Sequence, residues 1–389
     1  MKTRAAFILS LAAILTLAAG SAFGSYSGGL GTADNPYKIA TKADLLALAA
    51  TTADYGKCFI LTADINMTGQ VFTTAIIAAD TSSNIGFQGT TFTGTFDGND
   101  HKIINFTING GNNSYLGLFG FMDSGSVIKN IGLENCSVSG GTNSNYVGGL
   151  MGYNLGTVSN CYSTSSVSGG SNSYYVGGLV GYNYVNTVSN CYSTGSVSGG
   201  SDSYYVGGLV GENYAGTVSS CYSTGSVSAG SNSTFVGGLI GYNCISTVSN
   251  CYSTGTVSGY EEVGGLVGYY NGGSISNCYS TGAVSGSIDV GGLVGYDNSG
   301  SVVNSFWDTN TSGKTTSSGG TGKTTAQMKK LSTFTSAGWD FVNVWGIYNG
   351  QSYPCLKFLT GFNPADLNYS GKVDMQDFAI FADNWLTGD

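Results

Sequence analysis

Histidine, proline and charged residues are scarce in this chain of 389 residues, which has one histidine, three prolines and a formal net charge of −9. The single histidine, His101, excludes a zinc site built on two histidines and leaves one position at which a Ser-His-Asp triad could form. Its surroundings, FDGNDHKIINF, are typical of a surface turn that leads into a strand. The acidic balance, without any run of lysine or arginine, argues against nucleic acid as a partner.

Long apolar runs are also missing beyond the first two dozen residues. Lys2 and Arg4 precede an uncharged apolar run over residues 5–19, and small residues at 22–24 offer a cleavage point, so residues 1–24 are predicted to be a secretory signal peptide. No later stretch approaches the roughly 20 apolar residues that cross a bilayer. The sequence therefore predicts an exported bacterial protein, secreted or at the cell surface, with no transmembrane segment in the mature chain.

Glycine, in contrast, is abundant, and much of it lies in a repeated octet. VGGLVGYN begins at Val176, and near-copies begin at five other valines: Val147, Val206, Val236, Val263 and Val290. A fixed period of about 30 residues indicates a solenoid or a propeller. A propeller blade needs four strands in about 40 residues, whereas each unit here offers three β-prone pieces. The predicted fold class is all-β: a right-handed parallel β-helix with three short strands per coil and small helical caps.

Equivalent residues of successive coils lie above one another in a β-helix, about 4.8 Å apart. The octets therefore predict interior columns of valine and leucine, which no single coil could bury alone. A further column consists of five cysteines: Cys161, Cys191, Cys221, Cys251 and Cys278. Buried, reduced thiols are favoured here over disulfides, because thiols on directly stacked parallel strands meet the disulfide dihedral poorly.

An aromatic column is the candidate ligand face. Its members are Tyr153, Tyr182, Glu212, Tyr242, Tyr269 and Tyr296. Facing outward, the rings would form a platform for stacking sugars; facing inward or at a corner they would serve packing, and the sequence favours packing. Glu212 interrupts the column, and a single exposed carboxylate without a matched partner is more typical of surface variation than of a catalytic acid.

The ends of the array differ from its repeats, and five segments are predicted. They are the signal peptide (1–24), an N-terminal cap helix with irregular first coils (25–110), the repeats (111–310), a capping segment (311–362) and a calcium-loop segment (363–389). Thr41 is predicted to cap a short helix over the first coil, and Thr324 with Gln327 matches a capping box. In the capping segment, Trp339, Phe341 and Trp345 are expected to close the stack.

The sequence DLNYSGKVDMQD, residues 366–377, fits a twelve-residue calcium loop that precedes an apolar helix face. The predicted ligands are Asp366, Asn368, Ser370, Asp374 and Asp377, with the backbone carbonyl of Lys372. Gly371 would make the sharp turn between them. Serine and aspartate at the fifth and twelfth positions depart from the usual ligands, so modest affinity is expected. Calcium is the predicted cofactor; the alternative is an acidic turn before a helix.

Two resemblances arise from these motifs. The octets, together with FTGTFDGNDHKIINFTI and NSFWDTNTSG, make residues 30–358 similar to GLUG-motif proteins of bacterial surfaces and secretions, which include regions of IgA-cleaving metallopeptidases. That resemblance implies a β-helix but no single activity, and the peptidase zinc motif has no counterpart in this chain. Residues 363–389 resemble the calcium-loop and helix half of a type I dockerin, which implies a cohesin-type partner or an attachment tag.

Two functions are compatible with these features. The first is an exported, non-catalytic scaffold for adhesion or glycan binding, with a calcium-binding tail for attachment or assembly. The alternative is a polysaccharide-active hydrolase or lyase. A hydrolase needs two carboxylates about 5–9.5 Å apart, and a lyase of this shape needs a basic residue beside clustered acids, yet no lysine or arginine lies between Lys129 and Lys314. The sequence therefore favours the non-catalytic scaffold and leaves enzyme activity open.

Overall fold

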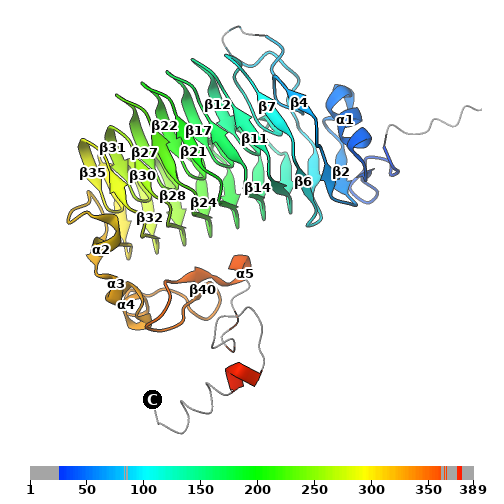
Figure 1. Cartoon of the computed structure of the whole chain (residues 1–389). Helices are drawn as coiled ribbons and strands as arrows, with labels where there is room; N and C mark the ends of the chain where they lie inside the picture. The colour runs from blue at the N-terminus through cyan, green and yellow to red at the C-terminus, as the bar shows by residue number, and fades with distance from the viewer. Residues whose placement is uncertain are drawn as a thin grey trace, which may run out of the picture.

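The computed structural model describes residues 26–82, 84, 86–360, 363, 365 and 375–378. Coils of short parallel strands stack along one axis into an elongated β-helix, with a short helix near the N-terminal end and a C-terminal segment along one side (Figure 1). The predicted all-β parallel β-helix is confirmed. The predicted signal peptide, residues 1–24, lies outside the described residues. No helix in the described part of the chain is long and apolar enough to span a bilayer.

The repeats contain five short strands, or four where two of them merge, rather than the three expected, because two of the three β-prone pieces bend in the middle. The octet bends at its glycines, and the piece TVSNCYST bends at Asn-Cys. The coil that starts at Asn145 shows the order: β12 (Asn145–Gly148), β13 (Met151–Asn154), β14 (Thr157–Ser159), β15 (Tyr162–Ser163) and β16 (Ser166–Ser168). Stacking of equivalent strands builds four parallel sheets, named A to D below.

Sheet A takes two strands from each complete coil. The strands that follow the octet glycines are β8 (Phe119–Met122), β13, β18 (Val180–Tyr184), β23 (Val210–Tyr214), β28 (Ile240–Ser249), β32 (Val267–Ser276) and β36 (Val294–Asp297). The others are β1 (Tyr37–Ile39), β2 (Cys58–Leu61), β5 (Thr95–Asp97), β9 (Val127–Lys129), β14, β19 (Thr187–Ser189), β24 (Thr217–Ser219) and β37 (Ser301–Val303). In β28 and β32 the two strands of a coil merge into one.

Sheets B, C and D take one strand per coil. Sheet B consists of β3 (Ile65–Asn66), β6 (Lys102–Ile104), β10 (Gly132–Glu134), β15, β20 (Tyr192–Ser193), β25 (Tyr222–Ser223), β29 (Tyr252–Ser253), β33 (Tyr279–Ser280), β38 (Phe306–Asp308) and β39 (Thr321–Lys323). Sheet C consists of β4 (Val71–Phe72), β7 (Thr107–Asn109), β11 (Ser137–Ser139), β16, β21 (Val197–Gly199), β26 (Val227–Ala229), β30 (Val257–Ser258) and β34 (Val284–Ser285). Sheet D consists of β12, β17 (Tyr174–Gly177), β22 (Tyr204–Gly207), β27 (Thr234–Gly237), β31 (Glu261–Gly264) and β35 (Ile288–Gly291).

The predicted columns form the core. Val147, Val176 and Val206 are register partners in sheet D, and the later octet valines continue the column. The octet leucines are fully buried beside them. The five predicted column cysteines are also buried and form no disulfide, as expected. The Sγ of Cys191, for example, donates to the carbonyl of Ser189 at 3.0 Å.

An asparagine corner joins sheet A to sheet B and explains the repeated SNC. Asn130, Asn160 and Asn190 have φ between 54° and 56°, in the left-handed region that asparagine tolerates better than most residues. Their side chains form a ladder, in which the Asn160 amide donates to Asn130 at 2.9 Å and the Asn190 amide donates to Asn160 at 3.1 Å. The corner therefore places a row of amides along the outer edge of sheet B.

The N-terminal cap is a helix, α1 (Lys42–Ala50), followed by the 3-10 turn η1 (Thr52–Asp54). Thr41 caps α1 as predicted, and the Asp44 carboxylate accepts from the Thr41 backbone N–H, which completes a capping box. Leu45 and Leu48 are fully buried against the first coils. Thr324 and Gln327 likewise form the predicted capping box, at the start of α3 (Thr325–Met328).

The predicted closing role of the C-terminal aromatic residues is wrong in position. The backbone of Thr316 and Ser318 bonds to Gly292 and Val294 of the last octet and covers the open end of the stack. Trp339 and Trp345 instead pack against tyrosines on the outer face of sheet B. The C-terminal segment lies beneath the β-helix in Figure 1. The capping-box pattern and the aromatic residues in the sequence could not show whether this segment covers the end of the stack or its side. This segment contains α2 (Thr309–Ser312), α3, α4 (Leu331–Thr335), the antiparallel pair β40 (Trp345–Gly346) and β41 (Cys355–Leu356), and α5 (Lys357–Thr360).

Candidate functional site

The predicted aromatic column is in register along sheet A. Tyr153 pairs with Tyr182, Tyr182 with Glu212, and the order continues to Tyr242, Tyr269 and Tyr296. Tyr153, Tyr182, Tyr242 and Tyr269 are partly buried, whereas Tyr296 at the end is 38% exposed. The structure thus brings the predicted residues together in one row.

A second aromatic column, which sequence reasoning missed, packs against that row. It starts at Tyr115, and its residues have φ between 56° and 62°: Tyr115, Tyr146, Tyr175, Tyr205 and Phe235. Tyr146 and Tyr175 stack at 4.7 Å with planes 2° apart, and Tyr175 meets the ring of Tyr182 edge-on at 5.1 Å. The predicted row is therefore half of a double aromatic seam, and its rings are largely occupied by packing.

Glu212 lies inside this seam and is 5% exposed, so the expectation of an exposed carboxylate is wrong. Its register neighbours are Tyr182 and Tyr242, whose bulk on either side leaves the carboxyl little contact with water. Burial raises the pKa of Glu212 to about 8. The sequence showed a lone acid in an aromatic column, but only the second column explains why that acid is buried.

A third aromatic ladder runs along the outer face of sheet B and was also missed. Its members follow the column cysteines directly in the sequence: Tyr162, Tyr192, Tyr222, Tyr252 and Tyr279. Neighbouring rings are 4.8–5.0 Å apart, with planes within 7° of parallel. The faces therefore cover one another, and the ladder presents ring edges and hydroxyls. The recurring Cys-Tyr-Ser was the available signal, because alternation places tyrosine outward wherever cysteine points inward.

The C-terminal segment covers part of this ladder. Trp345 packs against Tyr252 and Tyr279, with ring centroids 6.2 and 6.1 Å away, and the Tyr279 hydroxyl donates to the Pro354 carbonyl at 2.6 Å. Tyr279 is consequently only 1% exposed. The first two rings, Tyr162 and Tyr192, remain partly accessible. The C-terminal segment therefore covers Tyr252 and Tyr279 and lies next to the open part of the ladder, which Tyr162 and Tyr192 form.

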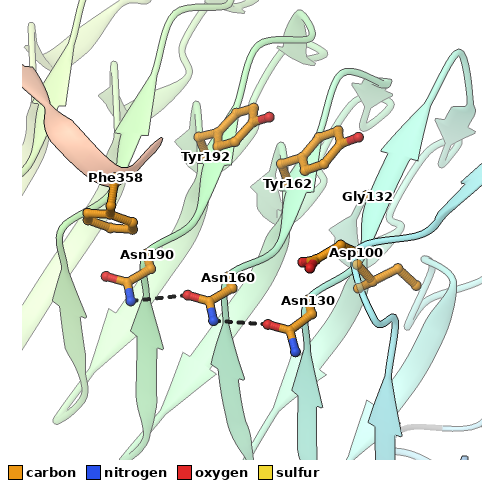
Figure 2. Close-up of a pocket in the computed structure, with 9 residues that line it drawn as sticks. Asp100, Asn130, Gly132, Asn160, Tyr162, Asn190, Tyr192 and Phe358 are labelled. Carbon is orange, nitrogen blue, oxygen red and sulfur yellow. Dashed lines mark hydrogen bonds between the residues drawn. The ribbon is translucent and has the colours of Figure 1, made fainter. Parts of the chain in front are cut away.

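The open part of the ladder forms a groove of about 400 Å³ (Figure 2). Tyr162 and Tyr192 lie along one side, and the amides of Asn130, Asn160 and Asn190 run beside them. Phe358 of α5, which is 52% exposed, stands at one end, and Asp100 lies at the other. Four successive coils and the C-terminal segment therefore contribute to one elongated site, called the groove below.

The amides retain binding capacity after forming their ladder. An asparagine side chain offers two N–H groups and two carbonyl lone pairs. Each ladder bond uses one N–H of one amide and one lone pair of the next, so Asn160, which takes part in two such bonds, still has one N–H and one lone pair. The groove therefore offers a donor and an acceptor at each coil.

A charged cluster lies at the Tyr162 end of the groove. The Glu134 carboxylate accepts from the Tyr162 hydroxyl and from Lys102, both at 2.8 Å, while the His101 ring lies 3.1 Å from Asp64. The hydrogen bonds from Lys102 and Tyr162 lower the pKa of Glu134. Burial and the Glu134 carboxylate raise the pKa of Tyr162. Both groups are thus held in their ordinary charge states at neutral pH.

The predicted calcium ligands Asp366, Asn368, Ser370, Lys372 and Asp374 lie outside the described residues. Asp377 lies in a helical turn over residues 375–378 and is 2% exposed. In the part of the chain that the structure describes, no group of three or more His, Cys, Asp or Glu residues could hold a metal ion. The calcium loop therefore stays a prediction from the sequence.

Comparison with known proteins supports the repeats and the fold. The GLUG motif is matched five times, at residues 143–168, 172–198, 202–228, 232–258 and 259–285. Each match begins at the turn before an octet and ends in sheet C, so one motif is one coil. The chain therefore contains GLUG repeats, as the resemblance implied.

Two curated relatives are similar over about a third of this chain. "Halomucin" of Haloquadratum walsbyi is 33% identical over 153 residues, which are 37% of this chain and 2% of the relative. A "Putative Gly-rich membrane protein" of Evansella cellulosilytica is 34% identical over 135 residues, which are 35% of this chain and 15% of the relative. The chain thus spans only a small part of either relative.

A solved structure shares the fold across most of the chain. It is titled "Crystal structure of a putative immunoglobulin A1 protease from Bacteroides ovatus", and it matches with a TM-score of 0.54 and 22% identity over 86% of this chain and 96% of that one. This similarity shows the architecture of the β-helix.

Proposed function

We propose that this protein is an exported, non-catalytic β-helix scaffold that binds a neutral polysaccharide chain along the groove. The observation that carries the proposal is the row of asparagine amides beside the uncovered Tyr162 and Tyr192. The names of the two relatives, a mucin-like name and a membrane protein, support a place at or outside the cell surface.

The groove suits sugars because a sugar hydroxyl is both a donor and an acceptor. Each Asn amide can meet it with the N–H and the lone pair that the ladder leaves over. The ring edges of Tyr162 and Tyr192 and the exposed ring of Phe358 supply apolar contact for the C–H groups of a sugar. Because the amides recur once per coil, the groove favours a chain that lies along the helix axis.

The charges favour a neutral chain over an acidic one. Asp100 is the charged residue among those that line the groove, and it would repel uronate or sulfate groups. Lys102, the cation of the neighbouring cluster, is paired with Glu134 at 2.8 Å. Among the described residues, the groove therefore lacks the cationic complement that an acidic polysaccharide needs.

Binding is favoured over turnover because the titratable groups at the groove are not poised for proton transfer. A general acid or base works best with a pKa near the operating pH. The pKa of Glu134 is lowered and that of Tyr162 is raised, so both move away from neutrality. Polysaccharide hydrolysis remains the alternative function, and the binding experiment below includes a test for it.

Removing the groove side chains should strongly weaken retention by neutral polysaccharides. Loss of two ring contacts at roughly 1 kcal/mol each predicts a weakening of about tenfold or more for Tyr162→Ala with Tyr192→Ala. Asn160→Gly, which keeps the left-handed backbone, should weaken binding by a smaller factor. Affinity electrophoresis measures the effect in gels that contain a neutral polysaccharide: xyloglucan, galactomannan or mixed-linkage β-glucan. Gels that contain pectin serve as the acidic comparison.

The matched control is Tyr174→Ala with Tyr204→Ala. These rings stack at 4.9 Å with planes 7° apart in sheet D, away from the amide ladder, so their loss should not change retention. Equal retention of the wild-type protein and the groove variant would contradict the proposal, as would retention by pectin alone. Release of reducing sugar over time would favour the enzymatic alternative.

We also propose that the C-terminal tail binds calcium for attachment or assembly, with a cohesin-type protein as the partner that the dockerin resemblance implies. Support comes from the spacing of oxygen ligands over residues 366–377. Calorimetry of the full mature chain should show binding of one calcium ion with a Kd between about 10 μM and 1 mM. The double variant Asp366→Asn, Asp374→Asn should lose that heat. No heat from the wild-type protein at millimolar calcium would end the proposal.

A further inference from the structure

A long connection between β4 and β5 builds a second pocket on the N-terminal coils. Both of its ends are bonded to β8: the Gly120 N–H donates to the Ile77 carbonyl at 2.8 Å, and the Phe92 N–H donates to the Phe121 carbonyl at 3.0 Å. Between these points, the described residues of the connection extend beyond the edge of the coils, at the top of Figure 1. The C-terminal segment that borders the groove lies below the coils in the same view.

This loop is fixed at its base. The Gln88 N–H donates to the Asp80 carboxylate at 2.9 Å, and the Thr81 hydroxyl donates to the Gln88 carbonyl at 3.0 Å. The ring of Phe87 packs on those of Tyr115 and Phe121, with centroids 5.2 and 4.9 Å away. Backbone bonds at both ends and aromatic contacts between them thus hold the loop against the coil.

Between the loop and two successive corners of the coils lies a pocket of about 770 Å³. Tyr115 and Tyr146, stacked at 4.7 Å, contribute to its lining from the coils, and Asp80 contributes from the loop. Asn112 and Asn143 line it from consecutive coils. The volume lies within the range of about 300–1,000 Å³ that is usual for small-molecule sites. No residue of this pocket lines the groove.

The polar groups of the pocket remain available to a ligand. Among the described residues, none forms a hydrogen bond with the side-chain amide of Asn112 or Asn143, so each can donate and accept. Asp80, whose carboxylate accepts a single N–H from the described residues, adds strong acceptor capacity, and it is the charged residue among those that line the pocket. Amides, hydroxyls and one carboxylate around aromatic rings suit a hydroxyl-rich, uncharged ligand and disfavour an anion.

We propose that this pocket is a second carbohydrate site, which takes a neutral mono- or disaccharide independently of the groove. The groove is open along the axis and suits the interior of a chain, whereas the pocket is bounded by the loop and suits a short sugar or a chain end. The proposal for the pocket depends on the geometry of the pocket and not on the proposed function of the groove. Its combination with the proposed function of the groove would let one molecule hold two glycan chains.

Saturation-transfer NMR on the full mature chain tests the site, with glucose, galactose, mannose, N-acetylglucosamine, cellobiose and lactose as probes. At least one probe should give signals with the wild-type protein and with the groove variant Tyr162→Ala, Tyr192→Ala. Removal of the open amides in Asn112→Ala with Asn143→Gly should reduce those signals at least fivefold. Glycine at position 143 keeps the backbone conformation, which has φ 62°.

Asn172→Gly is the matched control, because Asn172 occupies the equivalent turn one coil later, with φ 55°, and does not line the pocket. Its signals should equal those of the wild-type protein. Asn112→Trp, which fills the pocket from an exposed position, should lose the signals while its melting temperature stays unchanged. The proposal is overturned if no probe gives signals at millimolar concentration, or if signals survive in both pocket variants. If the groove proposal fails instead, the groove variant Tyr162→Ala, Tyr192→Ala will be retained by polysaccharides as strongly as the wild-type protein.

Discussion

Gly178→Ala is expected to destabilise the β-helix by about 3 kcal/mol or more, the upper end for overpacking a core. A Cβ at this octet glycine would overlap the backbone carbonyl of Gly208 in the next coil and the buried hydroxyl of Ser193 in its own coil. These backbone atoms cannot move aside without breaking the hydrogen bonds between stacked strands, because the same position recurs in every coil. Urea unfolding followed by circular dichroism measures the loss, as a lower midpoint.

Gly56→Ala is the control for this substitution. A Cβ at Gly56 has Thr93 Oγ1 as its nearest neighbour, at 3.3 Å, and the position needs no left-handed backbone. Its effect should stay within about 1 kcal/mol, the size usual for substitutions without such a mechanism. A Gly178→Ala protein as stable as Gly56→Ala would show that the coils can separate locally. The octet would then need another explanation than close backbone approach.

The fold was predictable because equivalent positions in successive repeats identify the register in which the strands pair. When Val147 and Val176 occupy the same place in two copies of a motif, parallel stacking aligns them without further information. The number of strands per coil was not predictable in the same way. The bends at Gly-Gly and at Asn-Cys depend on where backbones approach and on the left-handed conformation of residues such as Asn160. A period gives the length of a coil but not the position of its corners.

The candidate site was only partly predictable, for a related reason. Repetition revealed the row that contains Tyr153 and Tyr182, but not that Tyr146 and Tyr175 would pack against it. The groove also depends on contacts far apart in the sequence, since Phe358 lies beside Tyr192 only because the C-terminal segment folds back along sheet B. Such a return leaves no periodic signal. Sequence patterns located the aromatic residues, whereas the coverage of each ladder came from the tertiary structure.

The second large effect concerns Glu212, which breaks the aromatic seam. No cation accompanies it among its described neighbours, and burial alone raises its pKa, to about 8. Burial and, after it, the charge of Glu212 raise the pKa of nearby tyrosines: that of Tyr146 is above its usual value, and that of Tyr205 is about 12. After burial, the charge of Glu212 also contributes to the raised pKa of Tyr153, Tyr175, Tyr182 and Tyr242. The seam therefore accommodates the neutral carboxyl far better than the carboxylate.

The stability of the wild-type protein should consequently fall as the pH rises. The folded pKa of Glu212 is about 8 and the unfolded value is 4.5, so the folded state binds the proton more tightly. The contribution of the neutral carboxyl is complete below pH 4.5 and is lost as the pH rises through 8. With 1.36 kcal/mol for each unit, the loss is roughly 3 to 5 kcal/mol at pH 9.

Glu212→Gln removes this titration while keeping nearly the same shape. The variant should match the wild-type protein within about 1 kcal/mol at pH 4, and should exceed it by roughly 3 to 5 kcal/mol at pH 9. Urea midpoints at several pH values give the comparison, and the titration of Glu262, whose pKa is about 7, cancels because both proteins contain it. Asp202→Asn removes one surface acid and controls for net charge. A constant difference between Glu212→Gln and the wild-type protein at every pH would mean that the seam admits water, and that Glu212 ionises as it would at the surface.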